Sequence, residues 1–268
     1  MIKADLHIHS TVSDGSDSIE QIIKTAEGKG LDCISITDHD TVSHLSQIPK
    51  DTKVKVISGV EISAVDTSNN RRAHILGYNI QKPELITALT QSTLEARNRN
   101  SEKQAQILIR EGFRIDMNRL ARADGIYLYK QHVMDYLVST KQVTEMFGIF
   151  YKSIFKNNGI CAFDINYPDV SEAVKTIKAA GGQAVLAHSG QQQNFYLIPL
   201  LVPLGLDGLE LNHHANSEKD KETIKGFAEE YGLFLTGGSD YHGRYEPQPF
   251  GIGDFLSEES GAMAICRK

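Results

Sequence analysis

Short apolar segments that alternate like β-strands end repeatedly in histidine or carboxylate side chains, and this feature most constrains the fold. The first such segment, residues 3–8, carries His7, and His9 follows two residues later, so strand alternation places both imidazoles on one side. Asp14 follows in a loop. These residues form half of a metal site, although an H-x-H pair in an amphipathic strand also occurs as plain polar surface.

Later apolar segments supply the other half of such a site. A single histidine at a strand end is more often a structural residue, but six of the ten histidines follow this pattern, which chance does not easily produce. The further candidate ligands are His39 after the strand 32–37, Glu61 in the strand 54–62, His74 in the strand 72–78, His188 at the end of the strand 183–188, and Asp240 and His242 after the strand 233–238.

The strands alternate with helices over much of the chain. Helical periodicity with serine or glycine boundary signals predicts helices at 18–29, 170–180 and 217–231. A short helix to about Ile48 and a helix from His188 to about Leu204 are also expected, and the strand 207–211 carries Glu210. This alternation is typical of a βα barrel, whose chemistry collects at the carboxyl ends of the strands.

Residues 81–168 interrupt the alternation and are predicted to form a helical insertion, beside a barrel made of residues 1–80 and 169–268. One long helix is expected at 84–110, followed by shorter helical pieces. The aromatic residues there lack a surrounding basic field, so we expect them to form the core of the insertion and not a base-stacking platform. They are Tyr127, Tyr129, Tyr136, Phe147, Phe150 and Tyr151.

Composition restricts the partners of the chain. A net charge of −6 gives no reason to expect binding to duplex nucleic acid or to a membrane surface. Cys33, Cys161 and Cys266 are odd in number and lack C-x-x-C spacing, so a disulfide framework is not expected and Cys33 is interpreted as a buried thiol. Together with the absence of a leader and of a membrane-length apolar run, this favours a cytoplasmic protein.

The nine candidate ligands combine imidazole with carboxylate and include no cysteine, a donor set that suits Zn, Mn or Fe. Nine ligands exceed the needs of one ion, so two or three divalent ions are expected, with a carboxylate such as Glu61 as a bridge. The positive charge of three divalent ions would exceed the negative charge of the three carboxylates. The site would therefore favour an anionic, phosphate-bearing small substrate.

Several spaced motifs resemble those of the polymerase and histidinol phosphatase (PHP) family. Arg97 on a long helix, followed by Ala179-Ala180-Gly181-Gly182, further resembles the small metal-dependent PHP phosphoesterases. That group includes nucleoside 3′,5′-bisphosphate phosphatases and a 5′-to-3′ exoribonuclease. The motifs are Asp5-x-His7-x-His9, Thr37-Asp38-His39-Asp40-Thr41, Gly59-x-Glu61, His74-x-x-Gly77-Tyr78, Ala187-His188 and Gly238-Ser239-Asp240-x-His242-Gly243.

The resemblance implies an α/β fold, a distorted (β/α)7 TIM-like barrel with a trinuclear site of Mn, Fe or Zn. The implied reaction is hydrolysis of a phosphate monoester or terminal phosphodiester of a small nucleotide, such as a nucleoside 3′,5′-bisphosphate, by a metal-activated hydroxide. The helical insertion would contribute to substrate binding.

The chain departs from the family pattern near the substrate. Ser189 replaces a usual proline, and Asn216 stands six residues after Glu210, where a histidine is usual. His213 or His214 would replace that histidine and protonate the leaving group or hold phosphate, and a solvated histidine pair is the alternative. Asp38 is a further candidate catalytic residue, which would orient an imidazole.

Three residues are candidates for binding substrate phosphate. Arg97 would do so by bidentate hydrogen bonds, with a solvated helix face as the alternative. Residues 130–132 resemble an Arg-Pro-His pattern of the family only at His132. Arg244 follows the last pair of candidate ligands. Arg99 and His44 are expected at the surface.

Other functions remain open at this point: a 5′-3′ exoribonuclease on short RNA, a phosphatase of the histidinol-phosphate type, and a metal-dependent C–N hydrolase. A non-catalytic metal-bound module is a fourth class, against which the complete set of nine ligands argues. The absence of an obvious lysine for carbamylation after a strand argues weakly against the C–N hydrolase. The sequence does not define an oligomeric state.

Overall fold

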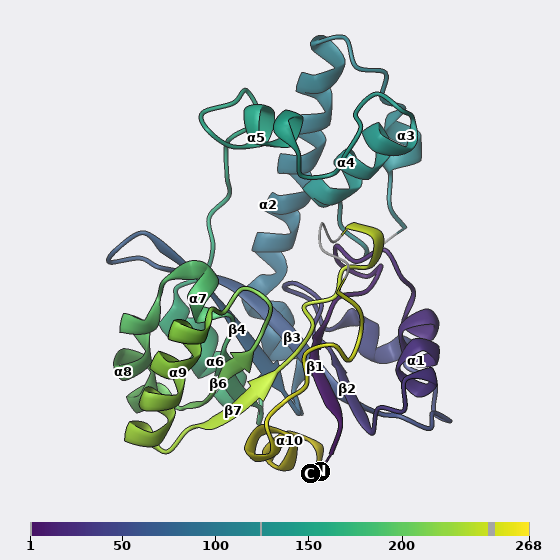
Figure 1. Ribbon diagram of the computed structural model, residues 1–268. Helices are drawn as coiled ribbons and strands as arrows, with labels where there is room; N and C mark the ends of the chain where they lie inside the picture. Colours follow the sequence, from purple (N-terminus) through teal and green to yellow (C-terminus); the bar gives the residue numbers. More distant parts are fainter. Residues whose placement is uncertain (1, 124, 246–249, 268) are drawn as a thin grey trace.

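The computed structural model describes residues 2–123, 125–245 and 250–267, and at its centre lies a curled sheet of seven strands (Figure 1). The strands are ordered across the sheet as they are in the sequence. All seven predicted strands are therefore confirmed. They are β1 (Ala4–Ile8), β2 (Cys33–Ile36), β3 (Lys55–Asp66), β4 (Arg71–Tyr78), β5 (Gln183–Leu186), β6 (Leu206–Asn212) and β7 (Phe234–Gly237).

The sheet differs from the expected barrel in the direction of one strand. β4 runs antiparallel to both β3 and β5, whereas the other neighbouring strands are parallel, so the sheet is a mixed, curled half-barrel and not a uniform (β/α)7 barrel. In the β3–β4 hairpin Ser63 pairs with His74. Because β4 runs in reverse, His74 in its first half reaches the edge at which β3 carries Glu61.

The chain after β7 returns to β1 by backbone hydrogen bonds. The amide of Asp240 donates to the carbonyl of His7 at 2.8 Å, and the amide of His9 donates to the carbonyl of Tyr241 at 2.9 Å. The first and last ligand-bearing segments of the chain therefore lie side by side.

Amphipathic helices cover the outside of the sheet, and three of them confirm predictions. α1 (Ile19–Gly28) begins after Ser18, whose hydroxyl accepts from the Gln21 amide, and it buries its apolar face against the sheet. α6 (Val170–Ala179) and α9 (Glu218–Tyr231) pack against the main apolar core in the same way.

The segment predicted as one helix after His188 is instead divided into short pieces. Pro199 and Pro203 lack the N–H groups that a continuous helix requires, which explains the division. The short helix expected near Ile48 is a 3₁₀ turn. The pieces are α7 (Ser189–Gln192), η2 (Phe195–Leu197), α8 (Ile198–Leu201) and η3 (Val202–Leu204), and the other 3₁₀ turns are η1 (Ser43–Gln47) and η4 (Gly243–Tyr245).

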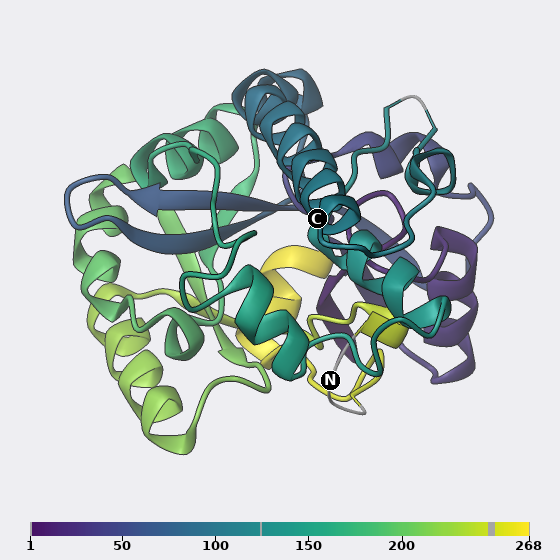
Figure 2. The ribbon, with the colours of Figure 1, turned by 90° about the horizontal axis from the view of Figure 1, so that it is seen from above.

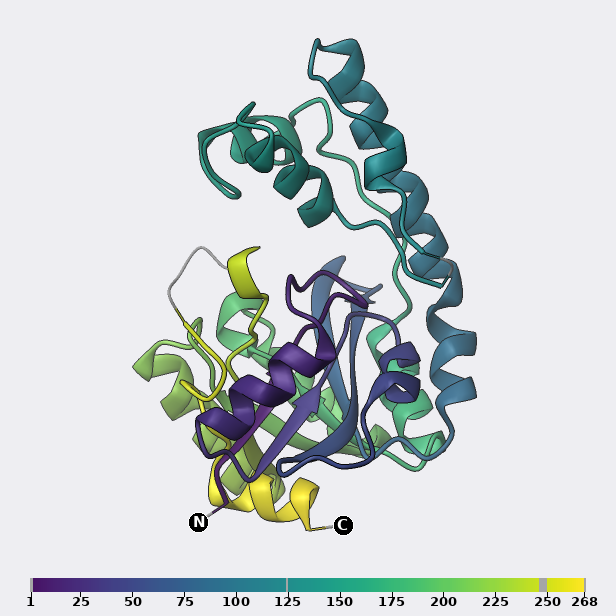
Figure 3. The same cartoon turned by 90° about the vertical axis from the view of Figure 1, so that its right-hand side faces the viewer.

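A helical region projects beyond the edge at which the parallel strands end. α2 (Pro83–Arg110) begins beside the sheet and continues past it, and α3 (Met117–Leu120), α4 (Lys130–Ser139) and α5 (Ile149–Phe155) lie around its far half (Figures 1 and 3). Seen from above, α4 and α5 lie over the sheet (Figure 2). No strand is present between residues 84 and 168 among the residues described, as predicted.

The helical region has an apolar core of its own, centred on Leu108, Val133 and Leu137. Tyr136, Phe150 and Tyr151 pack on this core, as expected, whereas Tyr127 and Tyr129 do not belong to it. Phe147 lies at the edge of the core, with its ring against that of Tyr151.

The cysteine prediction was wrong. Cys33 in β2 is disulfide-bonded to Cys266 in α10 (Glu259–Cys266), and only Cys161 is free. The two partners are 233 residues apart, so local spacing could not reveal the pair. Cysteine usage therefore gives no support for a reducing compartment. None of the helices in the described part of the chain combines the length and the hydropathy that a membrane-spanning segment requires.

Candidate metal centre

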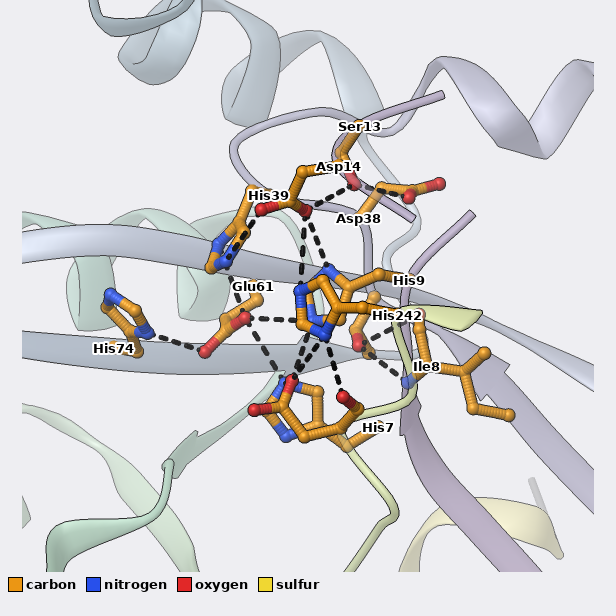
Figure 4. Close-up of polar contacts among 12 residues, drawn as sticks. His7, Ile8, His9, Ser13, Asp14, Asp38, His39, Glu61, His74 and His242 are labelled. Carbon is orange, nitrogen blue, oxygen red and sulfur yellow. Dashed lines mark hydrogen bonds and ion pairs between the residues drawn. The ribbon is translucent and has the colours of Figure 1, made fainter. Parts of the chain in front are cut away.

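The nine candidate ligands converge at the end of the sheet that faces the helical region, and most of them are labelled in Figure 4. His7 and His9 extend β1 to this edge and are completely buried. Gly238 leaves room for them, because a Cβ at that position would overlap the backbone of His7. The strand pattern that motivated the prediction thus places both imidazoles in the cluster.

Glu61 stands at the centre of the cluster. Burial alone would raise the pKa of this carboxyl group, but the histidines around it, His39 and His7 foremost, lower its pKa well below the usual range. Its Oε2 atom lies 3.2, 3.1 and 3.2 Å from nitrogens of His7, His9 and His39, and its Oε1 atom lies 2.7 and 3.0 Å from His74 and His188. Each oxygen of this carboxylate therefore faces a different set of imidazoles.

Asp240 contacts the same pair of histidines. Its Oδ1 lies 3.2 Å from Nε2 of His7 and 3.1 Å from Nε2 of His9. Asp240 and His188 both have positive φ angles, 51° and 23°, which are strained conformations for residues other than glycine. The surrounding structure holds these two side chains toward the cluster at a conformational cost.

A second group of donors gathers around Asp14. Its carboxylate lies 3.5 Å from Nε2 of His242 and 4.0 Å from Nε2 of His39. Burial would raise the pKa of Asp14, but these two histidines outweigh it and lower the pKa. Together with His9, these residues form one of four overlapping groups whose ligand atoms lie within 4.8 Å of one another.

The cluster fits metal ions because its facing atoms have no hydrogen-bond partners among the residues that the structure describes. Buried polar atoms in folded proteins are nearly always paired, so a group of unpaired buried atoms that face one another requires an explanation. A divalent ion of the Zn, Mn or Fe type accepts this mixture of nitrogen and oxygen donors. The unpaired atoms are Nε2 of His7 and His9, Nδ1 of His39, Oε2 of Glu61 and Oδ1 of Asp240.

Two residues that support the cluster had no predicted role. Glu210 in β6 accepts from Nδ1 of His7 at 2.9 Å and from the amide of His188 at 2.8 Å, which fixes the orientation of both. Gln131 in α4 donates to Oδ2 of Asp14 at 2.7 Å. Strand alternation directs Glu210 inward, to the face opposite its neighbours Leu209 and Leu211, and this pattern could have identified it as a residue of the site. The sequence contains no comparable signal for Gln131.

Asp38 lies behind the cluster. It accepts from the amide and hydroxyl of Ser10, both at 2.7 Å, and from the hydroxyl of Ser13 at 2.6 Å. His44 lies 3.1 Å from it and is completely buried, so the expectation of an exposed His44 was wrong. These contacts hold the loop that carries Asp14, and they do not bring Asp38 to the metal-type donors.

A cationic cavity of about 330 Å³ adjoins the cluster beneath the helical region. Asp14, His39 and His74 line it on the cluster side. Burial first, and then the neighbouring cations, lower the pKa of Lys130 to about 8. The cations that line this cavity are Arg72, Arg97, Lys130 and Lys156.

The two arginines of this cavity already have carboxylate partners. Arg97 donates to Asp40 at 2.6 Å and to Ser63 at 3.0 Å, and its guanidinium lies over the ring of Tyr129. Arg72 is paired with Asp164. Lys130 and Lys156 have no carboxylate partner among the residues described, so their charge faces the cavity.

Two other predicted phosphate ligands do not line this cavity. His132 accepts from the backbone amide of Tyr129 at 3.0 Å and is buried, and burial lowers its pKa to about 3. Arg244 forms a bidentate pair with Asp135 at 3.1 and 2.8 Å. Arg99 is exposed and pairs with Glu95, as expected.

The histidine pair after β6 divides into two roles. His213 is buried, lies 3.3 Å from Asp240 and accepts from the Ala215 amide. His214 lines a cavity next to Asp240 and His242. The Asn216 side chain donates to carbonyls of β6 and accepts from the Gly190 amide, so it joins β6 to α7 and does not act as a ligand.

Comparison with known proteins agrees with this geometry. Residues 5–183 match a family model described as the PHP domain. A phosphoribosyl 1,2-cyclic phosphate 1,2-diphosphodiesterase from Eggerthella lenta is 40% identical over 91% of this chain and 96% of its own length. A 5′-3′ exoribonuclease from Haemophilus influenzae is 30% identical over 90% of each chain.

A solved structure extends the agreement to the fold. A protein from Bifidobacterium adolescentis, described as a metal-dependent phosphoesterase, superposes with a TM-score of 0.86 at 25% identity. The superposition covers 98% of this chain and 94% of that one.

Proposed function

Because the chain belongs to the PHP family and is a metal-dependent phosphoesterase, we propose that its substrate is a small ribose phosphate that carries a second phosphate group. The supporting observation is the cationic cavity directly beside the cluster, which shares Asp14, His39 and His74 with it. A phosphoester held over the cluster would have Lys130 and Lys156 available for another phosphate of the same molecule.

The chemistry divides between bound ions and the chain's own side chains. Two or three divalent ions, Mn, Fe or Zn, held by the nine ligands would polarise the phosphoester and lower the pKa of water. Glu210 would keep Nε2 of His7 directed at the ions, because it fixes Nδ1 on the other side of the ring.

His214 is better placed than His213 to contact the leaving group. His213 already contacts Asp240 and accepts a hydrogen bond from the Ala215 amide, whereas His214 lines a cavity. Burial and the adjacent His213 lower the pKa of His214 to about 4, so its imidazole is neutral near pH 7. It would donate a hydrogen bond to a phosphate or leaving oxygen and would not deliver a stored proton.

Two compounds are the first substrates to test. The 40% identity to the Eggerthella protein favours phosphoribosyl 1,2-cyclic phosphate. The family resemblance favours a nucleoside 3′,5′-bisphosphate, such as adenosine 3′,5′-bisphosphate. Both have a reacting phosphoester and a second phosphate on one ribose. The exoribonuclease relative makes a short single-stranded RNA the third compound to test.

The test is product formation from these compounds with added Mn²⁺, followed by phosphorus NMR. We expect turnover of at least one doubly phosphorylated ribose and a loss of roughly 100-fold or more in His7→Ala. Metal-loaded protein that hydrolyses only the RNA, or none of the three compounds, would contradict the proposal.

The cationic cavity is tested separately. Lys130→Ala and Lys156→Ala should each raise KM about tenfold or more, with a much smaller change in kcat, because a charge-assisted bond to the non-reacting phosphate is lost. Arg99→Ala is the matched control, since Arg99 lies on the exposed face of α2. An equal effect of all three variants would exclude a specific phosphate subsite.

A further inference from the structure

A second cavity, of about 210 Å³, opens at the cluster next to the cationic cavity. Asp240 and His242 form its cluster side, where the cationic cavity has His39 and His74. Gln131 and Gln191 line both cavities, so the two are adjacent across the mouth of the centre. A substrate over the cluster can therefore extend in two directions.

The lining of the second cavity is aromatic and contains no lysine or arginine among the residues described. Apart from the candidate ligand His242, its rings are those of Phe147, His214 and Tyr245. Phe147 is the aromatic residue of the helical region that lies at the edge of its core, and its ring meets the ring of Tyr151 edge to face, with centroids 5.0 Å apart. One part of Phe147 therefore remains available to the cavity.

The other two rings are held in place. The ring of His214 stacks on His213 at 4.2 Å and on Phe250 at 5.3 Å. Nδ1 of His214 is buried and has no hydrogen-bond partner in the described part of the chain. Tyr245 is buried, and its hydroxyl donates to Asp135 at 3.4 Å. Rigid rings beside an unpaired imidazole nitrogen suit a flat, neutral group that carries its own hydrogen-bonding atoms.

The geometry points to a nucleobase subsite on the ring of Phe147, with the edge of His214 beside it, an inference that rests on the proposed function. A ribose with its reacting phosphoester at the cluster and its second phosphate in the cationic cavity lies between the two cavities. The aromatic cavity then receives a substituent elsewhere on the ribose that is flat and uncharged. Bases meet this description, and they stack on aromatic side chains whatever their identity.

The test compares adenosine 3′,5′-bisphosphate with ribose 3,5-bisphosphate, which has the same phosphates and no base, in the Mn²⁺-loaded full chain. We expect kcat/KM to favour the nucleotide about tenfold or more, which corresponds to the stacking of one base. Phe147→Ala should remove most of this preference. Ile149→Ala, at a neighbouring residue that is 84% exposed, is the control and should retain it.

Adenosine lacks phosphate, so its binding, measured by calorimetry, tests the aromatic cavity independently of catalysis. Binding to the wild-type chain that weakens about tenfold in Phe147→Ala would support the subsite. Equal kcat/KM for the two bisphosphates, or a Phe147→Ala effect that is the same for both, would overturn it. Turnover of the base-free compound tests the proposed function by itself, so the two failures are distinguishable.

Discussion

At the scale of single residues, Lys130 links substrate binding to pH. Its pKa is lowered to about 8, first by burial and then by Lys156, Arg97 and Arg72. The ammonium is therefore charged below this pH and becomes neutral as the pH rises through it. We expect kcat/KM for a doubly phosphorylated ribose to fall above about pH 8, measured as a pH–rate profile of the free enzyme.

The control for this prediction is Lys130→Arg, because a guanidinium remains charged over the whole range. This variant should lose the fall near pH 8 that the wild type shows. If both proteins show the same fall, another group is responsible, and Lys130 does not hold the second phosphate through its charge.

Asp38 is a residue whose importance we expect to be structural. Burial would raise its pKa, but His44 and the serine hydroxyls outweigh burial and lower the pKa to about 2. Its contribution to stability is therefore complete above the usual carboxyl pKa and is lost only as the pH falls toward 2. At pH 7, Asp38→Asn should lower the free energy of unfolding by about 2–4 kcal/mol, measured by urea denaturation. Asp51→Asn, at an exposed carboxylate, is the control; equal midpoints for the two variants would contradict this role.

At the scale of elements, the strands and the capped helices could be predicted because their signals are local. Ser18 and Ser217 start the helices that they were predicted to start, and the alternation of β1 correctly places His7 and His9. The reversed direction of β4 was missed although a signal was present, because the nine residues between the predicted strands 54–62 and 72–78 are too few for the crossover that a parallel pair requires.

The supporting contacts of the site were inaccessible from the sequence. Glu210 meets His7 across 203 residues of sequence, and Gln131 meets Asp14 across 117. Arg97 was expected to bind phosphate and lines the cationic cavity, but folding also gives it Asp40 as a partner. A candidate ligand can thus be identified from a motif, whereas its partners depend on the assembled fold.

The attachment of α10 gives a prediction at the same scale. The Cys33–Cys266 disulfide closes a loop of most of the chain and holds α10 at the end of the sheet opposite the cluster (Figure 1). Cys266→Ser should lower the stability by about 3 kcal/mol, or on the order of 10 °C in Tm, with kcat/KM nearly unchanged. Dithiothreitol should lower the Tm of the wild type and leave that of Cys266→Ser where it is. An unchanged Tm in the variant would show that the bond does not stabilise the protein.

At the scale of the whole molecule, the cluster joins segments from both ends of the chain. Its donors come from β1, β3 and β4 and from the segments that follow β1, β2, β5 and β7. Without ions, buried carboxylate and imidazole atoms face one another unpaired, which is unfavourable in the folded state and costs nothing in the unfolded chain. Metal binding should therefore stabilise the entire fold and not only the active edge.

Removal of metal is the measurement that follows from this argument. Addition of Mn²⁺ at about 1,000 times its dissociation constant should stabilise the chelator-treated protein by about 4 kcal/mol and raise Tm by roughly 10 °C. In His7→Ala the increase should be much smaller, because this variant removes a nitrogen that faces both Glu61 and Asp240. His44→Ala is the histidine control, since His44 is equally buried but contacts Asp38 behind the cluster; its Tm should start lower and still rise with Mn²⁺. The same rise in Tm in all three proteins would mean that Mn²⁺ binds elsewhere. The unpaired atoms of the cluster would then require a different ligand.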